Sequence, residues 1–551
     1  MYTLDLFLEF ANENKMAIFL NLILILINYP LEIIVLSSLT SRILASSTDI
    51  ERRWKSLIVL LMALIGCYVI LEFSSSLKDY NDSRIVPKFE SFVRNRIIER
   101  VFKQNEINCH NVNMGELIQR LMKVPISLST VYDRANKYLI PFFLTVTIVT
   151  AYLFYIHPPL GLISAVSFTI YITVFALVSR NQLEVSKKRE ADETNLYEDI
   201  DDTLSNVFTV FSLNQLGYEN DRLNNNTRKF DSTYTKELRD SARTKFVTGM
   251  MSIAIFVILI SSTLYFYRKD EIDTATTISL MAMVIFLVKH VNDTIRKASE
   301  AVIFMGTVTE NEDYLKILNS KTLQDGYMVG FFRGGAIEFK GVHFRYENSN
   351  IDALKNVSFS LRPMESVAII GHSGSGKSSI LKLIAGFYKP QKGCISIDGI
   401  DLNLAKRSYL RSHITYLSQH NRLFNRPIID NIIYGTKYNR DQAIRIIRKL
   451  NISKVLSAKD LHQHAGKHGD NLSGGQKQIV QLLRCYLLDN RIVLLDEPTS
   501  AIDPHYKRYV IALIRHIMKT RQVIMVTHDW SIANTFKRVI LIENGEIKRG
   551  N

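Results

Sequence analysis

Two hydrophobic patterns divide the chain. Up to about residue 291, long apolar runs alternate with polar segments, and a helical span needs about twenty mostly apolar residues to cross a bilayer. From residue 334 onward, short apolar runs typical of buried strands alternate with helical patterns. This alternation favours a mostly parallel sheet. The pattern therefore predicts an α-helical transmembrane domain followed by an α/β domain.

The membrane-length pattern occurs in six runs: residues 16–40, 55–75, 138–156, 160–179, 247–267 and 275–291. Pro30 is expected to kink the first of these spans. The connections alternate in length, and the two long ones, 76–137 and 180–246, are rich in Lys and Arg. Apolar residues recur in both near a 3.6-residue period. Each long segment is therefore interpreted either as helices that continue past the membrane or as a loop that packs on itself.

We expect a transmembrane domain over residues 1–318, a linker over 319–333 and the α/β domain over 334–551. The first fifteen residues mix apolar and acidic positions, which favours a short amphipathic helix on the membrane surface over a cleavable signal or transit peptide. Because the α/β domain follows the sixth span directly, both long segments are expected on its side of the membrane.

Composition adds two exclusions. The net charge of +15 accompanies 47% hydrophobic residues, and much of the basic excess lies in the long segments, so we expect no nucleic-acid partner. The four cysteines, Cys67, Cys109, Cys394 and Cys485, are scattered without paired spacing. That scatter favours a reducing compartment over a disulfide framework.

A phosphate-binding loop opens the chemistry of the α/β domain. The apolar run 366–370 precedes Gly371-His372-Ser373-Gly374-Ser375-Gly376-Lys377-Ser378, and a helical pattern follows. In this context glycines let backbone N–H groups face phosphate, and the helix N-terminus adds positive potential. Lys377 is expected to hold the β- and γ-phosphates and Ser378 to ligate Mg²⁺. The candidate nucleotide-binding residues of this loop are Gly371, Ser373, Gly374, Ser375, Gly376, Lys377, Ser378 and Ser379.

A second motif places two carboxylates at the end of an apolar strand, Ile492 to Leu495. We expect Asp496 to act on Mg²⁺ through its water shell and Glu497 to polarise the attacking water. Phosphoryl transfer asks a protein mainly for positioning and charge neutralisation, and adjacent carboxylates supply both.

Between these motifs lies Leu472-Ser473-Gly474-Gly475-Gln476. With the loop and the paired carboxylates, it makes residues 334–551 resemble the nucleotide-binding domain of an ABC transporter, and the six spans resemble the plan of an ABC exporter half-transporter. The resemblance favours helical extensions, joined by short crosswise helices, for the two long segments. It also implies roles for further residues: adenine stacking by Tyr346, Mg²⁺ sensing by Gln419, contact with a partner's γ-phosphate by Ser473, Gly474, Gly475 and Gln476, coupling of two sites by Asp503, and γ-phosphate contact by His528.

This resemblance implies ATP-driven export by a dimer that sandwiches two ATP molecules. A homodimer is expected because one chain holds every site residue, and a heterodimer is the alternative. A nucleotide-gated channel is less favoured, because Glu497, Ser473 and His528 are intact. The membrane, plasma or organellar, stays open, with the nucleotide domain on its ATP-containing side.

The substrate is less defined. Asp202-Thr203-Leu204-Ser205-Asn206 and Leu423-Phe424-Asn425 resemble mitochondrial half-transporters that export a glutathione-linked sulfur compound, while Gln476 and the acidic N-terminus argue against them. A lipid, drug or peptide exporter is the alternative. Polar residues within or beside the spans are candidates for an inward cavity or for snorkelling helix ends: Asn28, Glu32, Glu72, Lys289, His290 and Asn292.

Two departures from the family pattern are evident. Gly466-Lys467-His468-Gly469 stands where the family usually carries Gly-Glu-x-Gly, so Lys467 reverses a charge near the expected contact with a partner's long loop. Its expected ion-pair partners form an acidic run: Glu198, Asp199, Asp201 and Asp202. The family's C-terminal helical tail is also expected to be absent or very short.

Overall fold

The computed structural model describes residues 2–46, 50–104, 114–312, 315–316, 326–346, 349–419, 422–500 and 502–550. The chain divides into two compact units. The membrane unit comprises residues 1–103 and 112–320, and the α/β unit comprises residues 104–111 and 321–551. Cys67, Cys394 and Cys485 are free thiols, whereas Cys109 lies outside the described residues.

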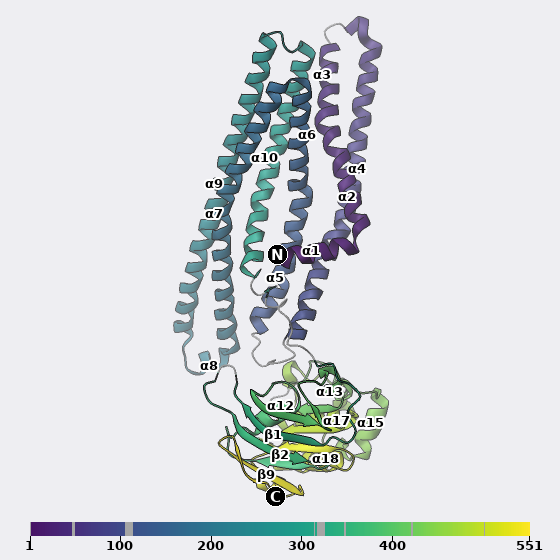
Figure 1. The fold of residues 1–551 in the computed structure, drawn as a ribbon, viewed down its shortest axis with the longest axis vertical. Helices are drawn as coiled ribbons and strands as arrows, with labels where there is room; N and C mark the ends of the chain where they lie inside the picture. Colours follow the sequence, from purple (N-terminus) through teal and green to yellow (C-terminus); the bar gives the residue numbers. More distant parts are fainter. Residues whose placement is uncertain are drawn as a thin grey trace. The chain divides into compact units, whose positions relative to one another are not determined.

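Helices make up the described part of the membrane unit (Figure 1). They are α1 (Tyr2–Glu13), α2 (Lys15–Pro30), the π-helical turn η1 (Leu31–Val35), α3 (Leu36–Ser46), α4 (Ile50–Gln104), α5 (Met114–Arg134), the π-helical turn η4 (Ala135–Leu139), α6 (Ile140–Ile156), α7 (Pro158–Ser205), α8 (Val207–Ser212), α9 (Leu216–Arg268) and α10 (Thr274–Glu310).

Six helical stretches in the described residues are long and apolar enough to cross a membrane: Lys15–Thr40, Trp54–Lys103, Leu117–Ile156, Pro158–Ser205, Leu216–Arg268 and Thr274–Glu310. Each contains one of the six predicted spans, so the predicted transmembrane architecture is confirmed. The first span changes geometry immediately after Pro30, where η1 begins. A π-helical turn is one of the recognised causes of a bend within a helix.

The second long segment is helical, as predicted. Helix α7 continues to Ser205, the short helix α8 follows, and α9 returns from Leu216 (Figure 1). In the first long segment, α4 runs to Gln104 and α5 begins at Met114, while the joint at residues 105–113 lies outside the described residues.

Helix α1 packs on α4 and α5 through aromatic contacts. Phe10 lies 4.9 Å from Phe89 between ring centroids, and Phe7 lies 5.7 Å from Tyr132. Leu6 and Phe10 are buried, whereas Leu4 and Leu8 are exposed. The predicted amphipathic helix therefore exists, and its position at a membrane surface stays a prediction.

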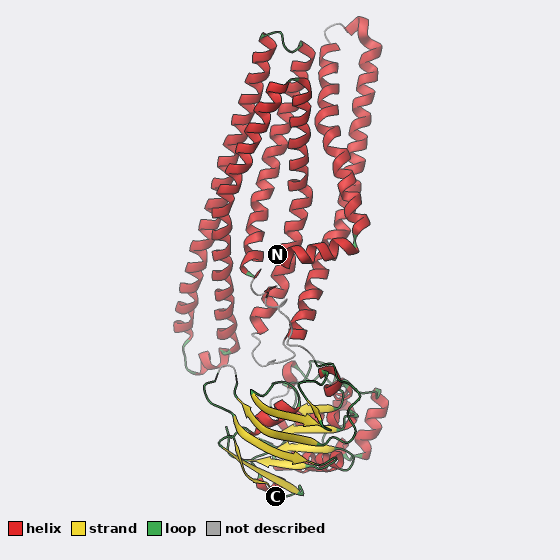
Figure 2. Ribbon diagram, in the orientation of Figure 1, coloured by secondary structure: helices red, strands yellow, loops and turns green. Residues whose placement is uncertain are grey.

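The α/β unit contains two sheets (Figure 2). The four-stranded sheet has the order β2-β1-β4-β5, and the six-stranded sheet has the order β10-β9-β3-β8-β7-β6. The strands are β1 (Ile337–Phe344), β2 (Leu354–Leu361), β3 (Val367–Ile370), β4 (Lys392–Ile397), β5 (Ile400–Asp401), β6 (Ile414–Leu417), β7 (Ile492–Asp496), β8 (Gln522–Val526), β9 (Arg538–Glu543) and β10 (Glu546–Gly550). All neighbours in the larger sheet are parallel except β9 and β10, which confirms the predicted mostly parallel sheet.

The helices of this unit are α12 (Lys377–Ile384), α13 (Arg407–Arg411), α14 (Ile428–Ile433), α15 (Arg440–Lys449), α16 (Ala458–Leu461), α17 (Gly474–Leu487), α18 (Pro504–Met518) and α19 (Trp530–Ala533), with short 3₁₀ turns η5 (Ile452–Lys454) and η6 (Lys467–Gly469).

Two apolar cores lie on opposite faces of the larger sheet. Val367 and Ile369 of β3 belong to one core with α12, and Ala368 and Ile370 belong to the other with α17 and α18. A parallel strand that is buried on both faces reads as a continuous apolar run, which is how β3 and β7 appear in the sequence. Phe331 and Phe332, from the end of the predicted linker, also pack into the first core.

Candidate functional site

The phosphate-binding loop connects β3 to α12. Gly374 and Gly376 have φ angles of 80° and 100°, which lie in the left-handed region that favours glycine. A Cβ added at Gly376 would stand 2.4 Å from the carbonyl oxygen of Ala353, so no larger residue fits there without movement. These glycines leave the backbone of the loop free to face a ligand.

Two polar side chains of this loop, Lys377 and Ser375, are buried. The buried Lys377 Nζ donates to the carbonyl oxygens of Gly371 at 3.0 Å and His372 at 2.7 Å. Burial lowers the pKa of Lys377, and the negative charges of Glu497 and Asp496 oppose this shift. The Ser375 hydroxyl is buried and has no hydrogen-bond partner among the described residues. Contact of these two groups with phosphate stays a prediction.

Asp496 lies at the end of β7 and joins two neighbouring elements. Its Oδ1 accepts a 2.8 Å hydrogen bond from the Ser378 hydroxyl, and its Oδ2 accepts a 3.0 Å bond from the Tyr416 hydroxyl. Burial raises the pKa of Asp496, while these two hydrogen bonds oppose the shift. Two of the three residues predicted to act on Mg²⁺, Ser378 and Asp496, therefore lie within hydrogen-bond distance of each other.

Sequence reasoning missed Tyr416. What brings Tyr416 to Asp496 is the strand register, because β6 pairs in parallel with β7 and Tyr416 lies opposite Leu494. That pairing cannot be read from the run Tyr416-Leu417-Ser418-Gln419 alone.

Glu497 follows Asp496 in the chain, and two of the other predicted site residues lie against its carboxylate. Gln419 Nε2 donates to Glu497 Oε2 at 3.0 Å, and His528 Nδ1 lies 3.5 Å from the same oxygen. Glu497 has a φ of 48°, uncommon for a residue with a Cβ, and its N–H donates to the carbonyl of Val526. The carboxyl ends of β6, β7 and β8 thus bring Gln419, Glu497 and His528 together.

Tyr346 lies beside the start of α12. Its hydroxyl is 3.0 Å from the Ser379 hydroxyl, and its ring packs edge-on against Tyr388 at 5.2 Å. The ammonium of Lys382 lies 5.6 Å from the centre of the Tyr346 ring. The predicted aromatic residue is thereby placed next to the phosphate-binding loop, and adenine stacking on it stays a prediction.

The Ser473–Gln476 segment forms the N-terminus of α17. Ser473 Oγ accepts from the Gln476 N–H, and the Gln476 side chain accepts from the Ser473 N–H, which is a capping box. A Cβ on Gly475 would stand 2.4 Å from the Tyr506 ring on α18. Asp503 caps α18 by accepting from the His505 N–H at 2.7 Å. In the described part of the α/β unit, no hydrogen bond or ion pair joins these residues to the phosphate-binding loop.

Two family models match the chain. One, ABC transporter transmembrane region, matches residues 16–291, and the other, ABC transporter, matches residues 354–500. The chain therefore belongs to the ABC transporter family, and the predicted six-span domain followed by an ABC nucleotide-binding domain is confirmed. It is a multi-pass membrane protein whose matched nucleotide domain implies the use of ATP.

Its curated relatives belong to the same family. It is 28% identical over 408 residues to ATP-binding cassette sub-family B member 6 of Xenopus tropicalis, covering 70% of this chain and 46% of that protein. It is 26% identical over 489 residues to an ATP-dependent lipid A-core flippase of Burkholderia pseudomallei (strain K96243), covering 86% and 79%. The chain spans about half the length of the first curated relatives that it matches.

One solved structure has a similar fold over nearly the whole chain. It is a bacterial Atm1-family ABC exporter with ATP bound, with a TM-score of 0.86 and 18% sequence identity. The match covers 98% of this chain and 95% of that one. At this identity the likeness concerns the fold alone.

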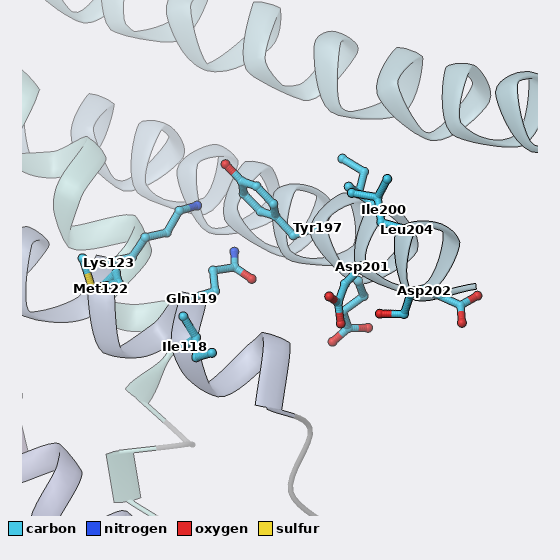
Figure 3. A pocket seen from close by; sticks show the side chains of 11 residues that line it. Ile118, Gln119, Met122, Lys123, Tyr197, Ile200, Asp201, Asp202 and Leu204 are labelled. Carbon is cyan, nitrogen blue, oxygen red and sulfur yellow. The ribbon is translucent and has the colours of Figure 1, made fainter. Parts of the chain in front are cut away.

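The acidic run in α7 lies partly beside Arg222 and partly on a cavity wall, and Asp202 belongs to both places. Asp199 accepts a 2.8 Å bond from Arg222, which also lies 3.6 Å from Asp202. Glu198, Asp201 and Asp202 line a cavity of about 680 Å³ between α7 and α5 (Figure 3). Lys467 begins η6 in the α/β unit and is exposed, and its pairing with the acidic run stays a prediction.

The polar residues predicted in the spans separate into two groups. Asn28, Glu32 and Glu72 line one cavity of about 410 Å³ in the membrane unit. The ring of His290 on α10 packs 5.1 Å from that of Tyr29, which also lines this cavity. Lys289 and Asn292 lie on the same helix but do not line the cavity.

Proposed function

We propose that the chain is one half of an ATP-driven exporter, in which two copies bind head to tail and hold two ATP molecules between them. The observation that carries this proposal is the hydrogen-bonded group at the strand ends: Ser378 with Asp496, and Gln419 with Glu497. These hydrogen bonds support the proposal that Asp496 acts on the metal and that Glu497 orients the attacking water. Such positioning is what phosphoryl transfer requires.

Mg²⁺ fits this site by the chemistry of its donors. Ser378 supplies a hydroxyl and Asp496 a buried carboxylate, both oxygen ligands of the kind that Mg²⁺ prefers. Bound there with ATP, the metal would neutralise charge that develops on the phosphate oxygens. Gln419 would sense the same region through its bond to Glu497.

In this proposal Glu497 holds and polarises the attacking water. Its Oε2 already accepts from Gln419 and lies 3.5 Å from His528, so the carboxylate has a fixed orientation. Lys377 would leave the carbonyls of its own loop for the β- and γ-phosphates. His528 and the loop amides would contact the γ-phosphate.

Dimerisation is proposed because Ser473–Gln476, at the N-terminus of α17, makes no hydrogen bond or ion pair with the nucleotide site of its own chain in the described residues. The N-terminus of α17 offers backbone N–H groups and positive potential, which suit the γ-phosphate of a partner's nucleotide. One chain carries both this segment and a complete phosphate-binding loop, so two identical copies would form two complete sites. A heterodimer with a second half-transporter is the alternative.

Closure of the two nucleotide domains around ATP would turn the transmembrane cavity outward, and hydrolysis would reset it. The exported substrate is a solute or a lipid. A lipid A-core flippase among the relatives supports lipid export, and the resemblance of Asp202–Asn206 to mitochondrial half-transporters supports a glutathione-linked sulfur compound. Drugs and peptides are the remaining alternatives.

The test is hydrolysis by the full chain in lipid nanodiscs. Glu497→Gln is expected to lower ATP turnover by about a hundredfold or more while ATP binding persists, because the substitution removes the water-orienting charge. Glu546→Gln removes a carboxylate whose ion pair, among the residues that the structure describes, is with Lys548 at 3.0 Å, and it serves as the matched control. Equal turnover by wild type and Glu497→Gln would exclude the assigned role.

A further inference from the structure

A cavity of about 410 Å³ opens in the membrane unit among α2, η1 and the start of α3, together with α4, η4 and α10. This volume lies in the range of pockets that bind drug-sized molecules. Carboxylates and aromatic rings make up about half of its lining. Three carboxylates come from Glu32, Glu72 and Asp79, and four aromatic rings come from Tyr29, Tyr68, Tyr138 and Phe286.

Helix α4 supplies one wall of the cavity. Tyr68, Glu72, Ser75 and Asp79 recur at spacings of three and four residues, so they form a single stripe on that helix. Glu72 lies within the predicted span 55–75, and Asp79 lies just beyond it. A carboxylate at such a depth is costly, which makes it a candidate for function.

Two π-helical turns supply the opposite walls. Glu32 belongs to η1, and Lys137 and Tyr138 belong to η4. A π-helical turn inserts an extra residue into an α-helix, and such turns are frequent at functional sites. Here both turns place polar side chains on the same cavity.

The cationic residues of the cavity are already matched by other carboxylates. Lys78 Nζ lies 3.0 Å from Asp82 Oδ2, and Lys137 Nζ lies 2.9 Å from Asp133 Oδ1. Neither Asp82 nor Asp133 lines the cavity.

The three carboxylates that line the cavity, unlike its two lysines, have no ion-pair partner among the described residues. Glu32, Glu72 and Asp79 make no ion pair with any described residue. Lys289 interacts electrostatically with Glu32, and Asp79 with Lys137, but neither pair lies within salt-bridge distance. The uncompensated charge on the cavity wall is therefore negative.

A buried hydrogen-bond network fixes the walls. Asp82 Oδ1 accepts from Asn21 at 2.6 Å and from Asn136 at 3.0 Å, which joins α4 to α2 and to η4. Asn81 also donates to Asn21 Oδ1 at 2.7 Å. Because every element in this network also lines the cavity, the positions of the carboxylates are preorganised.

We propose that this cavity binds an organic cation, a protonated amine or an onium group carried on an apolar body, as the exported solute. The carboxylates attract the charge, and the tyrosine rings offer cation–π contacts and cover the apolar part. This proposal rests on the export function proposed above and adds the class of substrate. An anionic solute such as a glutathione conjugate would face the three carboxylates and bind poorly.

The test uses the full chain in detergent micelles, with two probes of the same shape and opposite charge. Tetraphenylphosphonium is expected to bind saturably to wild type, and tetraphenylborate to bind at least about tenfold more weakly. The combined variant Glu32→Gln, Glu72→Gln, Asp79→Asn is expected to lose at least about tenfold in phosphonium affinity. Asp231→Asn, which removes one charge from an exposed position on α9, is the control and should bind like wild type.

Equal affinity of wild type for the two probes would overturn the proposal, and so would unchanged phosphonium binding by the combined variant. The probe comparison on wild type needs no variant to fold. ATP hydrolysis, measured on the same samples, separates this outcome from the export proposal. Intact, Glu497-dependent hydrolysis without cation binding contradicts the substrate class alone, whereas equal hydrolysis by Glu497→Gln contradicts the assigned ATPase role.

Discussion

The Ser378 hydroxyl donates a 2.8 Å hydrogen bond to Asp496 Oδ1, which joins the start of α12 to the end of β7. The two residues lie far apart in the sequence, and β3 and β7 each flank β8 in the sheet. This bond places both proposed Mg²⁺ ligands at one point of the sheet edge.

Ser378→Ala should remove one of those ligands. We expect the Mg²⁺ concentration for half-maximal hydrolysis to rise and turnover to fall by about tenfold to a hundredfold. Substitutions of residues that bind or orient a metal typically lower metal affinity or activity by factors of that size. A Mg²⁺ titration of ATP hydrolysis measures both. Ser412→Ala is the control, because the hydrogen bonds that the structure describes for this hydroxyl are local, to the Tyr409 carbonyl and to His413 Nδ1. An unchanged titration for Ser378→Ala would contradict the assignment.

Tyr416→Phe tests a residue that positions Asp496. Its hydroxyl favours the charged carboxylate, so its loss should raise the pKa of Asp496 further above the ordinary value. The acid limb of the pH–rate profile should therefore move to higher pH, with ATP binding at neutral pH retained. A profile that superimposes on that of wild type would show that this bond does not act on Asp496.

Gly475→Ala should destabilise the α/β unit. A Cβ at this position would stand 2.4 Å from the Tyr506 ring, so the ring or α17 must shift, at a cost of about 1–3 kcal/mol. Thermal unfolding measures the loss, and Tyr506→Ala in the same chain should relieve it. Gly217→Ala is the matched control, because an added Cβ there meets nothing within 4 Å. Equal melting temperatures for both glycine variants would contradict the packing argument.

Asp529 should stabilise α19 in a pH-dependent way. Its hydrogen bonds with Lys507 and Ser531 lower its pKa to about 2, below the ordinary value of about 3.9. Its contribution is therefore present above about pH 4 and is lost as the pH falls towards 2. Asp529→Ala should destabilise the protein by about 1 kcal/mol at pH 7 through loss of the helix cap. At pH 2 most of the pH-dependent part of this difference should be lost, because the carboxyl is then about half protonated in the folded state.

In a Trp54→Phe background, fluorescence of Trp530, the first residue of α19, reports unfolding next to Asp529. Chemical denaturation of wild type and Asp529→Ala at pH 7 and at low pH gives the comparison. A difference in midpoint that is the same at both pH values would contradict the charge-dependent part of the account.

Local patterns predicted the parts of the site that one segment specifies. The glycine spacing from Gly371 to Gly376 and the carboxylates after β7 each depend on a strand and the turn that follows it. The fold class followed for the same reason, because span length and strand alternation are local signals.

Contacts between segments were beyond the sequence. Tyr416 reaches Asp496 only through the β6–β7 register, and the shared oxygen of Glu497 depends on three strand ends that meet. The turns η1 and η4 also gave no signal: Pro30 predicted a bend but not the π-helical geometry that follows it. The cavity depends on both turns, which is why its lining could be guessed only in part, from Asn28, Glu32 and Glu72.

The central claim, a head-to-tail pair that shares two nucleotides, is tested most directly by mixing two inactive chains. Glu497→Gln removes the carboxylate of a chain's own site, and Ser473→Arg blocks the segment that serves its partner. A mixed dimer should contain one intact site, built from the Glu497 of one chain and the Ser473 of the other. Random pairing should then restore about a quarter of wild-type hydrolysis. Hydrolysis no greater than the sum of the two variants measured separately would contradict the account.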